Sequence, residues 1–196
     1  MYKLKSGINV DMFDVFDLRK DFYKEVKEVK KVGFDSVDFT LVGVGGYKNS
    51  IEKALGIIPD GLKAIQDEGL ELNSVHLPFY RFCYISSCDE AVRRFAVKEF
   101  KQIIEICDGF KPKNYVFHSG LSDPAVEGID KLRRPALIKS FQELAGATES
   151  AVCLENLPRE CDSPKEVIKT VDQVPKGKLC LDVNQVFWGT AEDAAL

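Results

Sequence analysis

Two short apolar runs in this sequence end on a carboxylate. Residues 151–158 read AVCLENLP, with Glu155 near the end of the run, and residues 179–184 read LCLDVN, with Asp182 in the equivalent place. Buried parallel strands are almost continuously hydrophobic, so an acidic residue there is costly unless a partner compensates its charge. Carboxylates that converge in this way can bind a divalent cation, and one of them can serve as a proton-transfer base.

Four further apolar runs end on a polar residue in the same manner. The runs SGIN (6–9), DSVD (35–38), NSVH (73–76) and YVFH (115–118) end on Asn9, Asp38, His76 and His118. Side chains alternate faces along a strand, so the residue two places earlier shares the face of each polar end. In the six runs these residues are Gly7, Ser36, Ser74, Val116, Cys153 and Cys180, all small. The residues between them are Ile8, Val37, Val75, Phe117, Leu154 and Leu181, all apolar. We therefore predict six strands, each with an apolar outer face and a polar inner end.

Helical spacing separates these strands. Residues 17–32 place Leu18, Phe22, Val26 and Val29 on one stripe among lysines and glutamates, which is typical of an amphipathic helix. Further helices are predicted over 60–70, 88–110, 133–148 and 163–174. Ser87 and Glu90 have the spacing of a capping box at the start of the helix predicted over 88–110.

The alternation of strands and helices predicts a parallel sheet built of βαβ units. In an open doubly wound sheet, polar strand ends gather at one switch point. In a (β/α)₈ TIM barrel, every strand end faces a shared mouth where the active site lies. Because all six predicted strands carry the inward polar end, the pattern favours the barrel.

Only about six βα units are predicted, whereas a barrel of this class typically needs about 250 residues. Residues 1–196 are therefore expected to form a single TIM-barrel domain that lacks its last two βα units. A fragment, closure of the sheet by another chain in a homo-oligomer, and a natively shorter barrel all remain open, since unpaired edge strands favour association.

Composition excludes several classes of protein. The formal net charge is −4, a balance that gives no sign of a basic nucleic-acid footprint but leaves room for a local patch, and no apolar run is long enough to span a membrane. The six cysteines include no CxxC pair, and the amino terminus lacks the pattern of a signal peptide. We expect a cytoplasmic protein that binds neither nucleic acid nor membranes.

The same strand ends resemble those of the xylose-isomerase-like TIM barrels, which include sugar isomerases and epimerases, inosose dehydratases and endonuclease IV. The matching stretches are GFDSVDFT, SVHLPF, YVFHSG, CLENLP and LCLDVNQVFWGTAED, in this order along the chain. The resemblance implies that Glu155 and Asp182 bind a divalent metal (Mn, Mg, Zn or Co), with two more ligands from strands seven and eight. It departs from the family at Gln185, where a histidine is common, and this weakens the likeness to endonuclease IV.

The leading hypothesis is a metal-dependent isomerase or epimerase of a small sugar or polyol, acting through an enediolate. Here Glu155 is ligand and catalytic base, while His76, His118 and Gln185 contact the substrate, with Asn9, Asp38 and Trp188 as weaker candidates. An inosose-dehydratase-like lyase, an endonuclease-IV-like phosphodiesterase and a non-catalytic truncated barrel are the alternatives. Each residue also has a structural interpretation: histidines and Asp38 can serve as hydrogen-bonded core residues, and Trp188 as packing.

Overall fold

The computed structural model describes residues 6–12, 21–41, 44, 51–78, 84–120, 129–157 and 164–183. Within these residues six strands alternate with five helices, and the strands form one parallel sheet in sequential order. The strands are β1 (Gly7–Asp11), β2 (Ser36–Thr40), β3 (Glu71–His76), β4 (Asn114–Phe117), β5 (Ala151–Glu155) and β6 (Gly177–Cys180). The helices are α1 (Phe22–Lys31), α2 (Ile51–Asp67), α3 (Glu90–Asp108), α4 (Ile129–Ala145) and α5 (Pro164–Val171).

This strand order confirms the predicted fold class. A doubly wound sheet reverses its strand order at a switch point, whereas the strands of a TIM barrel follow one another in sequence. The order β1-β2-β3-β4-β5-β6 is that of a barrel with six βα units. A search of the described helices for one able to cross a membrane found none.

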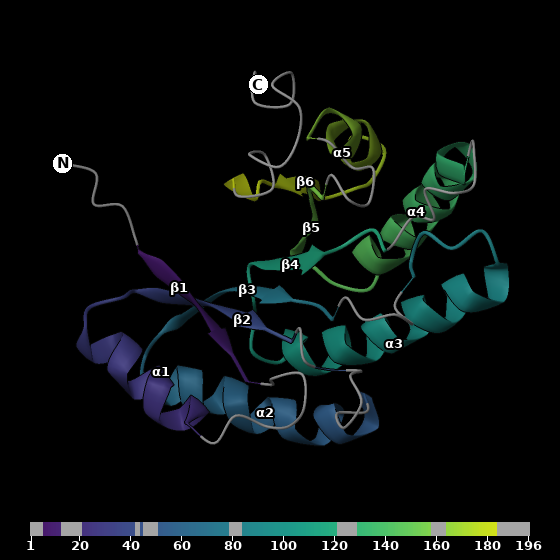
Figure 1. Ribbon diagram of the computed structural model, residues 1–196. Coiled ribbons are helices and arrows are strands. Elements are labelled where there is room, and N and C mark those ends of the chain that lie inside the picture. The colour runs from purple at the N-terminus through teal and green to yellow at the C-terminus, as the bar shows by residue number, and fades with distance from the viewer. Residues whose placement is uncertain are drawn as a thin grey trace. The chain divides into compact units, whose positions relative to one another are not determined.

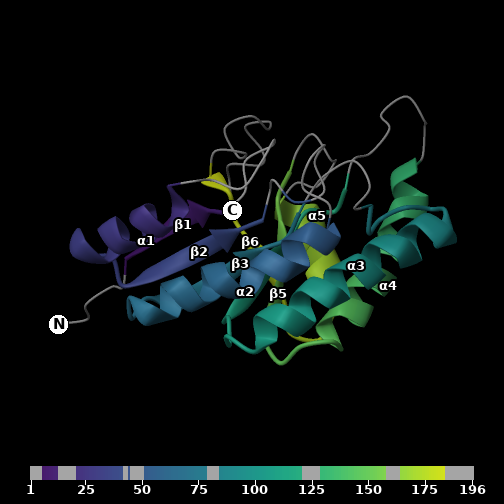
Figure 2. The ribbon, with the colours of Figure 1, turned by 90° about the horizontal axis from the view of Figure 1, so that it is seen from below.

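The chain divides into two compact units, and the first comprises residues 1–80 and 102–115. In this unit α1 and α2 cover one face of β1–β3, as the two views of Figures 1 and 2 show. The stripe predicted from the sequence is the buried face of α1, where Phe22, Val26 and Val29 are buried. The apolar outer residues Val37 and Val75 are fully buried, as expected for strands covered by helices.

Helix α2 is longer than the sequence predicts. It begins at Ile51 rather than residue 60, and it contains Pro59, which ordinarily interrupts a helix. Gly61 allows close packing here, because a Cβ atom at this position would lie 2.5 Å from the Sδ atom of the buried Met12. Packing against the sheet therefore outweighs the local signals of Gly56, Pro59 and Gly61 that favour a later start.

The second unit comprises residues 81–101 and 116–196. Its core contains an aromatic cluster in which Phe117 of β4 lies between Phe100 of α3 and Phe141 of α4, with ring centroids 5.7 and 5.3 Å away. All three rings are almost fully buried. Aromatic side chains bury the largest areas available to a core, so this cluster fixes the two helices against β4.

The start of α3 differs from the predicted capping box. Asp89, not Ser87, caps the helix, because its Oδ1 accepts the N–H groups of Ala91 and Val92 at 2.8 and 3.2 Å. The Ser87 hydroxyl oxygen accepts the N–H of Asp89 instead. Asp is as good a cap as Ser, and the first helical residue is Glu90, so the cap lies one residue before it.

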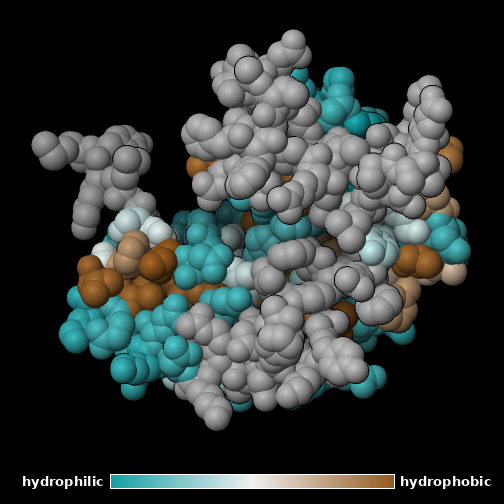
Figure 3. Space-filling model, in the orientation of Figure 1, coloured by the Kyte–Doolittle hydropathy of each residue, from teal (hydrophilic) through white to brown (hydrophobic). Residues whose placement is uncertain are grey.

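The first and last strands expose part of their apolar face. Ile8 of β1 is 36% exposed, and Leu181, just after β6, is 47% exposed. Figure 3 shows apolar surface over the start of β1 and the end of α1, where Ile8 and Val32 are exposed. The equivalent residues of the inner strands are buried, because strands in the middle of a sheet have neighbours on both sides.

We predict that Phe117→Ala lowers the free energy of unfolding by about 3–5 kcal/mol, the usual cost of removing a buried phenylalanine. Phe95→Ala is the matched control, because Phe95 is 55% exposed on α3, and it should change that free energy by no more than about 0.5 kcal/mol. Urea denaturation followed by circular dichroism measures both. Equal effects of the two substitutions would contradict the described core.

Candidate functional site

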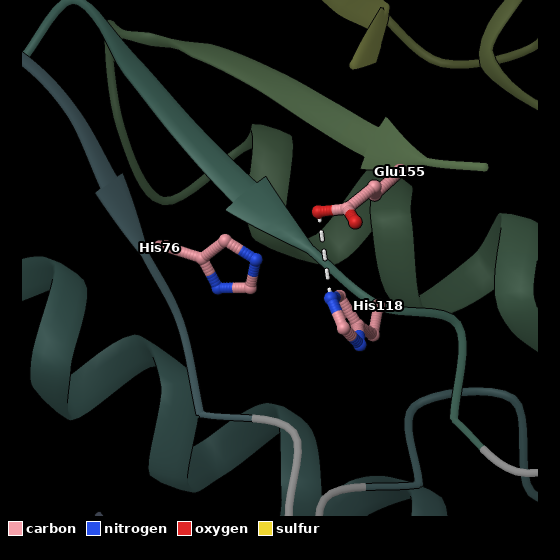
Figure 4. Close-up of side chains that lie close together, drawn as sticks. All are labelled: His76, His118 and Glu155. Carbon is pink, nitrogen blue, oxygen red and sulfur yellow. Dashed lines mark ion pairs between the residues drawn. The ribbon is translucent and has the colours of Figure 1, made fainter. Parts of the chain in front are cut away.

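The carboxylate of Glu155 and the imidazole of His118 face each other. Glu155 is the last residue of β5, and His118 follows directly after β4. Their side chains are only 10% and 9% exposed, and Glu155 Oε2 lies 3.4 Å from His118 Nε2. Figure 4 shows this pair at the ends of the two strands. The acidic end of the AVCLE run is therefore buried beside a partner.

The local sequence accounts for this placement. Val152 and Leu154 are fully buried residues of β5, so Cys153 and Glu155 point to the other face of the sheet. Cys153 is small and almost fully buried. Burial raises the pKa of its thiol to about 11, so the thiol is protonated at neutral pH and serves as an inert core residue.

The imidazole ring of His76, the last residue of β3, is oriented by a contact with the backbone. Its Nδ1 lies 3.0 Å from the carbonyl oxygen of Leu77. A carbonyl oxygen only accepts hydrogen bonds, so Nδ1 is the donor in this contact. Metal-binding histidines commonly donate one ring N–H to a carbonyl in this way.

The Glu155 carboxylate and the His118 imidazole can share one metal ion (Figure 4). Two ligands about 2.0–2.1 Å from one tetrahedral cation are separated by about 3.3 Å, close to the 3.4 Å between His118 Nε2 and Glu155 Oε2. A charge-assisted hydrogen bond is shorter, at about 2.7–2.9 Å. An imidazole nitrogen and a carboxylate oxygen are also ordinary donors to a divalent transition metal. The two residues thus form a possible His/Glu metal site.

Asp182 lies further along the sheet than Glu155. Glu155 pairs in register with Cys180, so Asp182 is two residues further along than the partner of Glu155. The backbone of Asp182 is held by Asn156, whose amide donates to Asp182 O and whose Oδ1 accepts the Asp182 N–H, at 3.1 and 2.7 Å. The roles of Glu155 and Asp182 as ligands remain predictions.

The polar residues predicted to end the first two strands lie in the middle of those strands. The sequence predicts that Asn9 and Asp38 end their strands, but β1 continues to Asp11 and β2 to Thr40. Asn9 pairs with Asp38, Asp38 pairs with Ser74, and His76 pairs with Thr40, so His76 lies two residues beyond the level of Asn9 and Asp38. Barrel sheets have such a stagger.

The side chains of Asn9 and Asp38 form hydrogen bonds with residues of the adjacent strands. The Asn9 amide donates to Thr40 Oγ1, and Asp38 Oδ1 accepts from the Asn73 amide and the Ser74 hydroxyl. These bonds hold β1, β2 and β3 together. A role of either residue in substrate binding stays a prediction. Gln185 and Trp188 lie outside the described residues.

Asn156 is a residue of this region that the sequence interpretation missed. It is fully buried directly after Glu155 and binds the backbone of Asp182. The signal was present in the sequence, because a buried amide at a strand end must find hydrogen-bond partners.

The sequence of residues 26–196 matches the family described as xylose isomerase-like TIM barrel. The chain belongs to this family. A comparison with curated proteins gave no match.

Solved structures with this fold include sugar epimerases. The chain is similar to a D-psicose 3-epimerase crystallised in the presence of D-fructose, with a TM-score of 0.73 and 16% identity, covering 96% of this chain and 66% of that one. For the D-psicose 3-epimerase of Clostridium cellulolyticum H10 with D-tagatose, the values are 0.70, 17%, 94% and 65%. For an AP endonuclease, family 2, of Brucella melitensis, they are 0.64, 16%, 91% and 68%. At these identities the likeness shows the fold, and the chain spans about two-thirds of the length of these structures.

We predict that Zn²⁺ shifts the ring nitrogen signals of His118 in a saturable way. His76 and His118 are the only histidines of the chain, so ¹⁵N-histidine labelling gives two sets of ring signals, and His76→Asn assigns them. Direct ligation changes the shift of the bound nitrogen, which is why the His118 set should respond. A titration in which the His118 set does not move, or in which its shifts grow without saturating, would contradict a metal site at His118 and Glu155.

Proposed function

We propose that the protein is a divalent-metal-dependent isomerase or epimerase of a small sugar or polyol. The observation that carries this proposal is the buried carboxylate of Glu155 facing the His118 imidazole at the ends of adjacent barrel strands. The carboxyl ends of the strands are where TIM barrels place their active sites. The structural likeness to D-psicose 3-epimerases supports the same reaction class by analogy.

The metal would be held by Glu155 together with His118, and Asp182 is a further candidate ligand. Oxygen-rich ligation suits Mg²⁺ or Mn²⁺, and a histidine nitrogen widens the choice to Zn²⁺ or Co²⁺. When bound, such a cation polarises the hydroxyl and carbonyl oxygens of a sugar and stabilises negative charge on them.

Glu155 would also move the proton. Its carboxylate takes the proton from the carbon beside the carbonyl, the C–H electrons form the enediolate double bond, and the carbonyl oxygen gains the negative charge. For isomerisation, the proton returns to the former carbonyl carbon while the hydroxyl proton of the first carbon passes to the former carbonyl oxygen, so that the first carbon becomes the new carbonyl. For epimerisation, a second acid on the opposite face protonates the first carbon and the original carbonyl forms again. Burial of Glu155 keeps competing water away from the carboxylate and the carbanion-like intermediate.

The substrate would be oriented by further polar side chains. Asn9 and Asp38 are candidates from the middle of β1 and β2, and Gln185 and Trp188 are further candidates from the sequence. Sugar hydroxyls both donate and accept hydrogen bonds, so amide and carboxylate side chains suit them. A cytoplasmic location accords with this proposal, because small sugars are metabolised there.

We predict that Glu155→Gln reduces the affinity for Mn²⁺ at least about tenfold and reduces turnover of a ketose substrate by at least about a hundredfold, since it removes both a charged ligand and the base. The matched control is Glu149→Gln, because Glu149 is fully exposed shortly before β5. Calorimetric titration with Mn²⁺ measures affinity, and chromatography of D-fructose and D-tagatose incubations identifies the products.

Equal metal affinity and turnover in Glu155→Gln and the control would contradict the role given to Glu155. Asp182→Asn decides the remaining ligand: a loss of affinity similar to that of Glu155→Gln would add Asp182 to the site. Release of water from the substrate, without an isomer or epimer, would show a dehydratase instead.

A further inference from the structure

Arg133 is a buried arginine of α4 that contacts the turn directly after His118. It is 7% exposed. Its Nη2 donates to Ser119 Oγ at 3.1 Å and to the carbonyl oxygen of Gly120 at 2.9 Å. Its Nε and Nη2 both donate to Ser86 Oγ, at 3.2 and 3.1 Å. One guanidinium therefore binds three residues from two segments far apart in the sequence.

These bonds fix the backbone on the carboxyl side of His118. On its amino side, His118 follows β4, where Phe117 is locked in the aromatic cluster. On the other side, Ser119 and Gly120 are held by Arg133. The position of the imidazole relative to Glu155 thus depends on two anchors, one of which is the guanidinium.

Segment 84–86, which Arg133 contacts through Ser86, is held by α4 at a further point. Ser140, also on α4, donates to the carbonyl oxygen of Ile85 at 2.6 Å and accepts from Nη1 of the buried Arg93 at 2.9 Å. Segment 84–86 is therefore bound to α4 at two points, through Ser140 and through Arg133. Gly120 packs tightly on the same segment: its φ is +96°, and a Cβ atom there would lie 3.1 and 3.2 Å from two atoms of Tyr84.

We propose that Arg133 is a positioning residue that holds the His118 imidazole in place for metal binding opposite Glu155. This inference rests on the proposed function, because it assigns Arg133 to the support of the same site. The planar guanidinium suits the task, since its donors point in fixed directions to several acceptors at once, which a lysine ammonium on a flexible chain does less well. Partners behind a metal ligand commonly set its affinity for the metal.

The test compares Arg133→Lys with Arg134→Lys. Arg134 is the next residue of α4 and its side chain is 28% exposed, but its bonds go to Glu166 and Thr170 of α5, and none of those described reaches residues 84–86 or 119–120. The two variants separate a loss of general stability, which both should show in urea denaturation, from a loss of the position of His118.

The first measurement is the ring signals of the two histidines in metal-free, ¹⁵N-histidine-labelled protein. Arg133→Lys should shift or split the signals of His118 and leave those of His76 unchanged, while Arg134→Lys should leave both sets as in the wild type. The second is Mn²⁺ affinity by calorimetry: Arg133→Lys should lower it about tenfold or more, against less than twofold for Arg134→Lys.

Gly120→Ala provides an independent variant should Arg133→Lys fail to fold. It disturbs the same turn through backbone strain and contact with Tyr84, and it should move the His118 signals alone. Unchanged His118 signals in a folded Arg133→Lys or Gly120→Ala protein would overturn the inference. If the wild type binds no Mn²⁺, the proposed function fails, and the metal-free signals still decide whether Arg133 positions His118.

Discussion

The burial of one carboxylate is the constraint on which the rest of this structure depends. An ionised side chain that leaves water needs an opposite charge or hydrogen bonds in compensation. Glu155 is at the end of a strand whose other face is filled with fully buried valine and leucine, so its carboxylate cannot turn to solvent. The imidazole of His118 lies opposite, at a spacing that suits two ligands of one cation better than a direct hydrogen bond.

The elements around this pair are organised to hold it. The strand before His118 is fixed by three packed phenylalanines, and the turn after it is fixed by a buried arginine. The backbone after Glu155 is fixed by Asn156, which exchanges two hydrogen bonds with Asp182. Precise sites usually need such support, because a displaced ligand costs affinity even when its chemistry is intact.

Periodicity predicted much of the fold because it reflects short-range physics. The alternating strands and the stripe of α1 follow from which side chains can be buried, and this can be read from neighbouring residues. The start of α2 could not, because the helix packs closely at Gly61 against Met12, which is distant in the sequence. The sequence also placed Glu155 and Asp182 at equal levels, whereas the strand register sets Glu155 beside Cys180. Register depends on how neighbouring strands pair, so the residues of one strand alone do not reveal it.

The most direct test of the central claim is anomalous diffraction from crystals soaked in Mn²⁺ or Zn²⁺, recorded on both sides of the metal absorption edge. This account predicts one strong peak about 2.0–2.2 Å from His118 Nε2 and from a carboxylate oxygen of Glu155. The same map would show whether His76 and Asp182 complete the coordination. No peak at the Glu155 carboxylate, or a peak confined to surface side chains, would contradict the claim that this buried pair is a metal site.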